Sequence, residues 1–141
     1  MKIAIIDGQG GGIGKSIIEK IKKISDKKFE LIAIGTNSMA TSNMMRAGAQ
    51  RGATGENSVV IMSQKVDIII GPLAVIMSNA MMGEITPKMA EAIGSSEAHK
   101  ILIPINRCGV HIVGTEELSV NEMLEKVKEE TEKYLKDFGG N

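Results

Sequence analysis

The sequence predicts an α/β fold in which a doubly wound, mostly parallel sheet lies between two layers of helices. Three observations support this prediction. Short apolar segments alternate with segments of helical periodicity along the chain, which is typical of parallel strands joined by right-handed crossovers. The 141 residues are 43% hydrophobic but only 2% aromatic, so the core must be aliphatic. Glycine or polar residues follow several of the apolar segments. We expect a single three-layer domain that spans residues 1–141.

Six short segments are candidates for strands, and the one at residues 49–52 is the least apolar. Most are continuous apolar runs, as expected for strands that are covered on both faces. The expected strands are residues 3–6, 29–34, 49–52, 65–72, 99–105 and 111–113.

Apolar positions at helical spacing and characteristic end residues indicate the helices. Ser38 is expected to cap the second helix. Thr86 followed by Pro87 is a typical helix start, and Ser119 with Glu122 forms a capping box for the last helix. The expected helices are residues 13–24, 39–47, 54–64 or 57–64, 87–94 and 120–138.

The segment that precedes residue 65 has two interpretations. Val59, Val60 and Ile61 could form a strand, or they could belong to the third helix. We favour the helix, because only residues 63–65 would otherwise separate two parallel strands, and a parallel crossover needs a longer connection.

A glycine-rich loop after the first strand is the main candidate for a binding site. Glycines between a strand and a helix let a phosphate approach the backbone, and the N-terminus of the helix attracts its charge. Five glycines within seven residues exceed the need of one turn, so we expect a phosphate or pyrophosphate here, flanked by an aspartate and a lysine. The candidate residues are Asp7, Gly8, Gln9, Gly10, Gly11, Gly12, Ile13, Gly14, Lys15 and Ser16.

Residues after other strands are expected to complete a crevice at the carboxyl ends of the strands, where open α/β sheets bind ligands. Thr36, Asn37 and Ser38 would contact a ribose or a second phosphate, and Arg107 would close the far side. The second strand is not followed by the acidic residue that usually binds a ribose, so NADP or another phosphorylated nucleotide fits better than NAD.

Three further side chains could join this crevice. Arg46 and Arg51 lie close enough in the chain to reach a phosphate. Glu84 is either a general base in the crevice or part of a helix cap.

The loop resembles two known motifs in part. The spacing of Gly8, Gly12 and Gly14 resembles the fingerprint of short-chain dehydrogenases, but the one tyrosine, Tyr134, is followed four residues later by Phe138 rather than lysine. Residues 11–16 resemble a P-loop. Two features disagree with it, because Gln9 replaces the outer glycine and no later strand ends in an acidic residue.

The leading hypothesis is a protein that binds a nucleotide or a phosphorylated small molecule and has no evident catalytic residues. Three alternatives stay open, namely a small NADP-linked oxidoreductase, a P-loop-like ATP-binding enzyme and a structural dimerisation module. The sequence leaves the roles of Asn106 and Cys108 open. No metal is expected, because His99, Cys108 and His111 lack paired ligand spacing.

The composition limits the partners. With 17 basic and 17 acidic residues, the chain has no driving force for non-specific binding to nucleic acid or membranes. The single cysteine and a start that runs directly into a strand favour the cytoplasm. Ten methionines and the apolar residues 73–82 favour a homodimer, although ordinary core packing explains them equally well.

Five segments carry a resemblance to a known family. They are residues 6–15, 35–42, 51–57, 83–90 and 104–108, which read IDGQGGGIGK, GTNSMATS, RGATGEN, GEITPKMA and PINRC. Over nearly its full length the chain resembles a conserved bacterial family of small Rossmann-like proteins that is known as a domain of unknown function. The resemblance implies a Rossmann-like fold in a cytoplasmic protein and assigns no activity or ligand.

Overall fold

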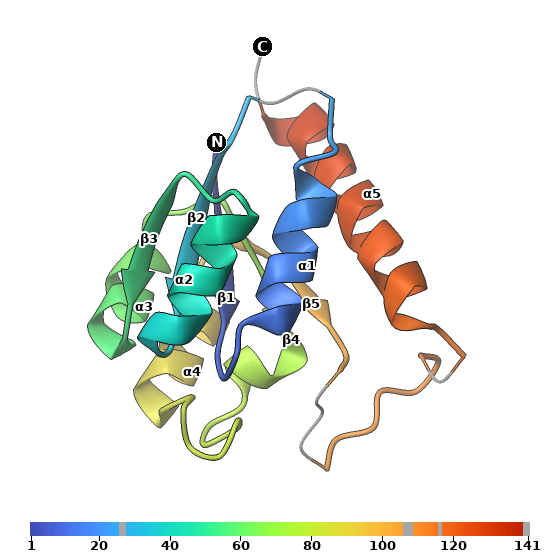
Figure 1. Cartoon of the computed structure of the whole chain (residues 1–141). Coiled ribbons are helices and arrows are strands. Elements are labelled where there is room, and N and C mark those ends of the chain that lie inside the picture. Colours follow the sequence, from blue (N-terminus) through green and yellow to red (C-terminus); the bar gives the residue numbers. More distant parts are fainter. Residues whose placement is uncertain (26–27, 106–108, 116, 140–141) are drawn as a thin grey trace.

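All five strands run parallel in one sheet, in the order β3-β2-β1-β4-β5. The structure is a computed structural model that describes residues 1–25, 28–105, 109–115 and 117–139. Figure 1 shows the sheet in the middle of the molecule with helices on both sides. The strands are β1 (Lys2–Asp7), β2 (Glu30–Gly35), β3 (Arg51–Thr54), β4 (Ile68–Pro72) and β5 (His99–Ile103).

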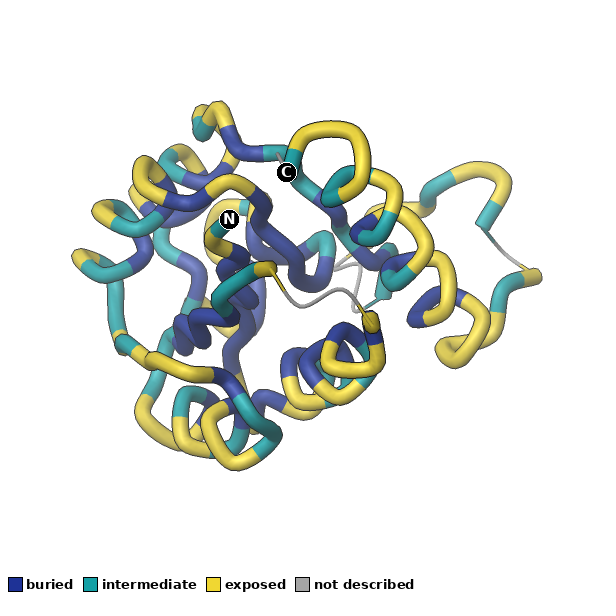
Figure 2. The backbone as a smooth tube through the Cα atoms, turned by 90° about the horizontal axis from the view of Figure 1, so that it is seen from above, coloured by how far each residue is buried: buried dark blue, intermediate teal, exposed yellow. Residues whose placement is uncertain are grey.

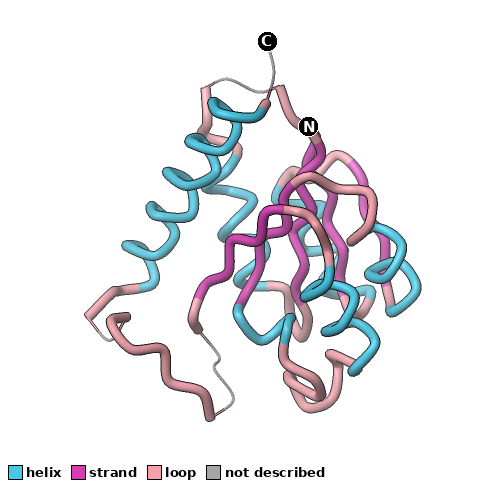
Figure 3. Tube along the Cα trace, turned by 180° about the vertical axis from the view of Figure 1, so that it is seen from behind, coloured by secondary structure: helices cyan, strands magenta, loops and turns pink. Residues whose placement is uncertain are grey.

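The helices form two layers, as the sequence predicts. One layer contains α1, α2 and the long α5, and the other contains α3, α4 and the short 3-10 helix η1. Seen from behind, α5 lies well apart from α3 and α4, with the strands between them (Figure 3). The helices are α1 (Gly12–Ile21), α2 (Ser38–Ala47), α3 (Glu56–Met62), η1 (Leu73–Ile76), α4 (Pro87–Ser95) and α5 (Val120–Phe138).

The alternation of side chains along the strands divides the core in two. Ile3 and Ile5 of β1 pack into the cluster under α1, α2 and α5, whereas Ala4 and Ile6 pack into the cluster under η1, α3 and α4. All four are fully buried. Figure 2 shows the buried strands surrounded by helices whose outer turns are exposed. This is the three-layer, doubly wound α/β fold that the sequence predicts.

The order of the strands determines where a crevice can form. Strands β2 and β3 follow β1 on one side of it in the sheet, and β4 lies on the other side of β1. The direction therefore reverses between β1 and β4, and ligands of open α/β sheets bind at the carboxyl ends of the strands at such a reversal. The start of β1 and the end of α5 lie at the opposite, amino edge (Figure 1).

One expected strand is wrong. Residues 111–113 lie in a segment without strand structure, although their apolar character suggested a strand. The Thr115 hydroxyl instead donates to the Ile112 carbonyl at 2.7 Å, and the backbone N–H of Thr115 donates to the same carbonyl. These are turn contacts, and among the described residues no strand pairs with residues 111–113.

Several boundaries differ by a few residues. Asn37, rather than Ser38, caps α2, because its side chain accepts the N–H of Ala40 at 2.9 Å. Helix α3 replaces the alternative strand at residues 59–61, as we favoured. Helical-type hydrogen bonds continue after α3 to Gln64 and Lys65, which delays the start of β4 to Ile68. Strand β3 begins at Arg51 rather than at residue 49, and β5 ends at Ile103.

Candidate functional site

The glycine-rich loop is held close to its neighbours by glycines that have no room for a side chain. A Cβ on Gly8 would lie 2.6 Å from Oγ1 of Thr36 and 2.7 Å from Sδ of Met81. Gly11 has φ 72° and lies against the backbone of Ala40, which a Cβ would meet at 2.9 Å. The loop after β1 therefore packs tightly between the loops that follow β2 and η1.

The buried side chain of Asp7 caps the N-terminus of α1. Its two carboxylate oxygens accept the backbone N–H groups of Gly8 at 2.8 Å and of Gly14 at 2.7 Å, and the residue is 4% exposed. Burial raises the pKa of Asp7 above 3.8. This effect exceeds the opposing hydrogen bonds from Gly14 and Gly8, and the charge of Glu84 adds to it. Two of the backbone N–H groups that we expected to bind a phosphate, those of Gly8 and Gly14, therefore already donate to the Asp7 carboxylate.

Glu84 connects three loops at the carboxyl edge of the sheet. Its Oε1 accepts the N–H of Gln9 at 2.8 Å, the hydroxyl of Thr36 at 2.6 Å and the amide of Asn37 at 2.9 Å. Partial burial raises the pKa of Glu84, but these three donors together outweigh burial and lower the pKa below 4.5. Glu84 is therefore an ionised group that lies at the end of β2.

The chain reaches this geometry through an unusual loop after η1. Asn79, Met81 and Met82 all have positive φ, at 67°, 56° and 57°, and Gly83 follows at 91°. Such angles are unfavourable for residues with a side chain. Backbone hydrogen bonds compensate, because Asn79 N–H donates to Ile85 at 2.7 Å and Ile85 N–H donates to Ala80 at 3.1 Å. The resulting loop places the Glu84 carboxylate within hydrogen-bond distance of the Gln9 N–H.

The outer face of the glycine loop is open. A Cβ on Gly10 or on Gly12 would meet nothing within 4 Å, and both residues are exposed. The Gly10 carbonyl accepts the Asn43 amide at 2.7 Å. The Asn43 side-chain oxygen in turn accepts from Arg46 at 3.0 Å. The Arg46 guanidinium of α2 is thus linked through the Asn43 side chain to the exposed backbone carbonyl of Gly10.

The remaining predicted site residues lie in different surroundings. Lys15 is exposed, and its Nζ lies 4.0 Å from the Glu19 carboxylate rather than on Asp7. Ile13 packs partly against the core, and Ser16 is half-buried in α1. Ser38 is exposed at the start of α2. Arg107, with Asn106 and Cys108, lies outside the described residues.

Comparison with known proteins identifies the family. The sequence matches the family model described as Domain of unknown function (DUF3842) over residues 2–136. The chain belongs to this family. The family resemblance inferred from the five sequence segments is thereby confirmed.

Two further comparisons accompany this match. No curated protein matches the sequence. A similar solved structure is the dodecameric FMN-dependent UbiX-like decarboxylase from Escherichia coli O157:H7. That protein is 10% identical, the match covers 100% of this chain and 95% of the other, and the TM-score is 0.44. At this identity the likeness concerns the fold alone.

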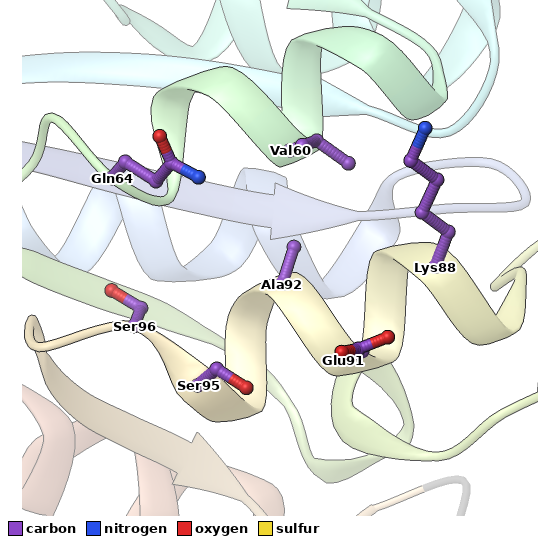
Figure 4. A pocket seen from close by; sticks show the side chains of 7 residues that line it. All are labelled: Val60, Gln64, Lys88, Glu91, Ala92, Ser95 and Ser96. Carbon is purple, nitrogen blue, oxygen red and sulfur yellow. The ribbon is translucent and has the colours of Figure 1, made fainter.

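This member of the DUF3842 family has a hollow elsewhere, between α3 and α4. The hollow has a volume of about 300 Å³ and is drawn in Figure 4, where the Lys88 ammonium lies at the far end from Gln64 and Ser96. Its polar groups do not converge on one point in that view. The glycine loop, where several polar groups meet around Gln9, is the better candidate site.

Neither a candidate metal cluster nor a membrane-spanning helix is found in the part of the chain that the structure describes. Among these residues no three His, Cys, Asp or Glu side chains are arranged to hold a metal ion. No described helix is long and apolar enough to cross a membrane.

The apolar segment 73–82, which suggested a subunit interface, is only partly buried within the chain. Ala74, Val75, Ala80 and Met81 are buried, whereas Met82 is 97% exposed. Core packing therefore accounts for the four buried residues, whereas Ile76 and Met82 are exposed and the homodimer stays a prediction.

Proposed function

We propose that the carboxyl edge beside β1 binds a nucleotide or a closely related phosphorylated ribose compound. One observation carries the proposal. Gln9 and Gly10 are adjacent. The Gln9 N–H donates to the Glu84 carboxylate, and the Gly10 carbonyl accepts the Asn43 amide, whose oxygen accepts from Arg46. A fixed anion and a cation therefore flank the same open backbone at the reversal of strand order. Hydroxyl and phosphate groups that are linked in one ligand match this arrangement.

The phosphate is assigned to the outer face of the loop. The backbone N–H groups of Gly10 and Gly12 have no hydrogen-bond partner among the described residues. Both residues lie at the N-terminus of α1, where anions are stabilised. Arg46 has no carboxylate partner among the described residues and can donate to a phosphate. Asp7 is buried, and its carboxylate accepts the N–H groups of Gly8 and Gly14 rather than those of Gly10 and Gly12.

The ribose is assigned to Glu84. Its Oε1 is occupied by three donors, whereas its Oε2 has no hydrogen-bond partner among the described residues. The lowered pKa keeps Glu84 ionised at neutral pH, and a carboxylate accepts hydrogen bonds from ribose hydroxyls. It would repel a second phosphate. The absence of an acidic residue after β2 favoured NADP, but Glu84 supplies such a group from another loop, so we now favour a ligand with free ribose hydroxyls.

Isothermal titration with AMP, ADP, NAD, NADP and inorganic phosphate tests the proposal. We expect AMP to bind more tightly than phosphate and NAD to bind more tightly than NADP. Arg46→Ala should weaken AMP binding about tenfold, because it removes a charged hydrogen-bond donor.

Arg51→Ala is the matched control. Arg51 begins β3 and pairs with Glu30 at 2.7 Å, so it carries the same charge at the amino edge. It should leave AMP binding unchanged. An absence of binding by all five ligands at millimolar concentration would show the proposal to be wrong, and equal losses in the two arginine variants would indicate non-specific attraction.

A further inference from the structure

We propose that Asp7 makes the site selective for a phosphate with a single negative charge, as in a phosphodiester of a nucleoside, over the doubly charged phosphate of a monoester. This inference rests on the proposed function and names the class of ligand that the site accepts. The observation behind it is that the N-terminus of α1, to which we assign the phosphate, already holds the Asp7 carboxylate.

The Asp7 carboxylate and the open backbone of the loop belong to the same helix end. Helix α1 begins at Gly12, and its third residue, Gly14, donates its N–H to Oδ2 of Asp7 at 2.7 Å. The N–H of Gly12, in the same turn, has no hydrogen-bond partner among the described residues. The free N–H groups of a first turn point in one direction along the helix axis. A phosphate that accepts from Gly12 would therefore lie beside the carboxylate.

The packing keeps the carboxylate at this position. A Cβ on Gly14 would lie 3.1 Å from Cβ of Asp7 and closer still to Sδ of Met44. Asp7 is buried, and Met44 is fully buried. The second carboxylate oxygen of Asp7 accepts the N–H of Gly8 at 2.8 Å. Since both oxygens are bound and the side chain is enclosed, we expect the charge of Asp7 to stay at the helix end when a ligand binds.

The other charges around the loop do not compensate for a second negative charge on the ligand. Burial raises the pKa of Asp7, and the negative charge of Glu84 adds to this effect. Arg46 of α2 is the cation that is linked to the loop, because the Lys15 ammonium lies 4.0 Å from the Glu19 carboxylate. Neither β2 nor β4 has a charged residue at its carboxyl end. Two carboxylates and one arginine therefore surround the loop, so a second charge on the phosphate adds more repulsion than attraction.

The charge of a phosphate depends on how many of its oxygens are esterified. A monoester such as AMP has a second pKa of about 6 and carries two charges above that pH. A phosphodiester has one ionisable oxygen and keeps a single charge. The site therefore suits a nucleotide whose phosphate is joined to a second group.

AMP and its methyl ester, in which a methyl group is attached to one phosphate oxygen, differ by this charge. We expect the methyl ester to bind the unchanged protein about tenfold more tightly than AMP at pH 8. At pH 5 AMP also carries one charge, and the two affinities should agree within about twofold. The comparison at pH 5 controls for any contact that the methyl group itself makes. Isothermal titration measures both affinities.

Asp7→Asn removes the charge and keeps the size of the side chain, so the preference for the methyl ester at pH 8 should disappear. Asp67→Asn is the matched control, because Asp67 accepts the backbone N–H of Lys2 at 2.8 Å at the amino edge. It should keep the preference. A larger loss of preference in Glu84→Gln than in Asp7→Asn would show that Asp7 is not the selecting residue.

A second measurement needs no variant and holds even if Asp7→Asn does not fold, which circular dichroism shows. Titrations at pH 7 in two buffers with different heats of ionisation count the protons that are taken up on binding. A tenfold preference for the single charge raises the second pKa of bound AMP to about 7, so AMP should take up about half a proton. The methyl ester should take up none.

The outcomes separate the two proposals. If AMP binds at least as tightly as the methyl ester at pH 8, or binds without proton uptake at pH 7, the charge selectivity is wrong while the proposed function stands. If neither ligand binds the unchanged protein at either pH, the proposed function is wrong and the selectivity falls with it.

Discussion

The carboxylate of Asp7, the last residue of β1, accepts the backbone N–H of Gly14 in the first turn of α1 at 2.7 Å. A strand end thus caps the helix that follows it, across the whole glycine loop. The same carboxylate also holds Gly8, so one side chain determines both ends of the loop. The loop conformation therefore depends on an internal anion and does not require a ligand to form.

Asp7→Ala should destabilise the fold by about 1–3 kcal/mol, because two buried amides lose their acceptor. Urea denaturation followed by circular dichroism measures this loss. Asp67→Ala is the control, since Asp67 accepts one exposed amide, that of Lys2, at 2.8 Å, and it should cost clearly less. Equal losses in the two variants would contradict the capping role of Asp7.

Glu84→Gln should change how stability depends on pH. The folded pKa of Glu84 is lowered from 4.5, so ionised Glu84 stabilises the folded state above that pH, and this contribution is lost as the pH falls through the lowered value. The free energy of unfolding of the wild type should therefore exceed that of Glu84→Gln at pH 7, and the difference should shrink below about pH 4.5. The raised pKa of Asp7 acts in the opposite direction, but it is present in both proteins and largely cancels. A difference that stayed constant from pH 7 to pH 3 would rule out this linkage.

Gly12→Ala should raise the stability of the protein and weaken its binding of AMP. Gly12 is the first residue of α1, and a Cβ there would meet nothing within 4 Å, so alanine should stabilise the protein by about 0.4–1 kcal/mol through the unfolded state. The methyl group would stand on the open face that we assign to the phosphate, and AMP binding should weaken. Thermal denaturation and isothermal titration measure the two effects. A more stable variant that binds AMP as tightly as the wild type would show that the phosphate does not bind at this face.

Gly71→Ala should destabilise the sheet by about 1–3 kcal/mol, the range for overpacked sites. A Cβ at Gly71 would collide with the carbonyl oxygen of Ile6 in the adjacent strand β1, and a backbone atom cannot rotate away. Gly94→Ala, in α4, is the counterpart, because a Cβ there meets nothing within 4 Å and should stabilise the helix. Urea midpoints of the two variants should move in opposite directions, and a shift in the same direction would disagree with the packing between β1 and β4.

The sequence was sufficient to predict the fold because its main signals are local. The apolar run before Asp7 and the helical spacing after Gly12 each depend on neighbouring residues, and the capping box at Ser119 and Glu122 is formed as expected. The failure at residues 111–113 is also local in origin. Apolar residues raise the expectation of a strand, but a strand additionally needs a hydrogen-bonding neighbour, which periodicity does not reveal.

The candidate site was harder to predict because it combines distant residues. Glu84 and Gln9 are separated by 75 positions, and the contact depends on positive φ angles at Met81 and Met82, which are uncommon for methionine. The sequence drew attention to Glu84 through its place before Thr86 and Pro87. Nothing in the sequence indicated that it would supply the acidic group missing after β2. Asp7 was expected to flank a phosphate together with Lys15, whereas in the structure its carboxylate accepts the loop amides of Gly8 and Gly14.

The start of β1 and the end of α5 lie at the amino edge, away from the glycine loop. A purification tag or a surface anchor attached to either end would consequently extend away from the carboxyl edge. The protein can therefore be immobilised through a terminus with Gln9, Glu84 and Arg46 still facing the solution, which suits it to sensor-based screening of small molecules.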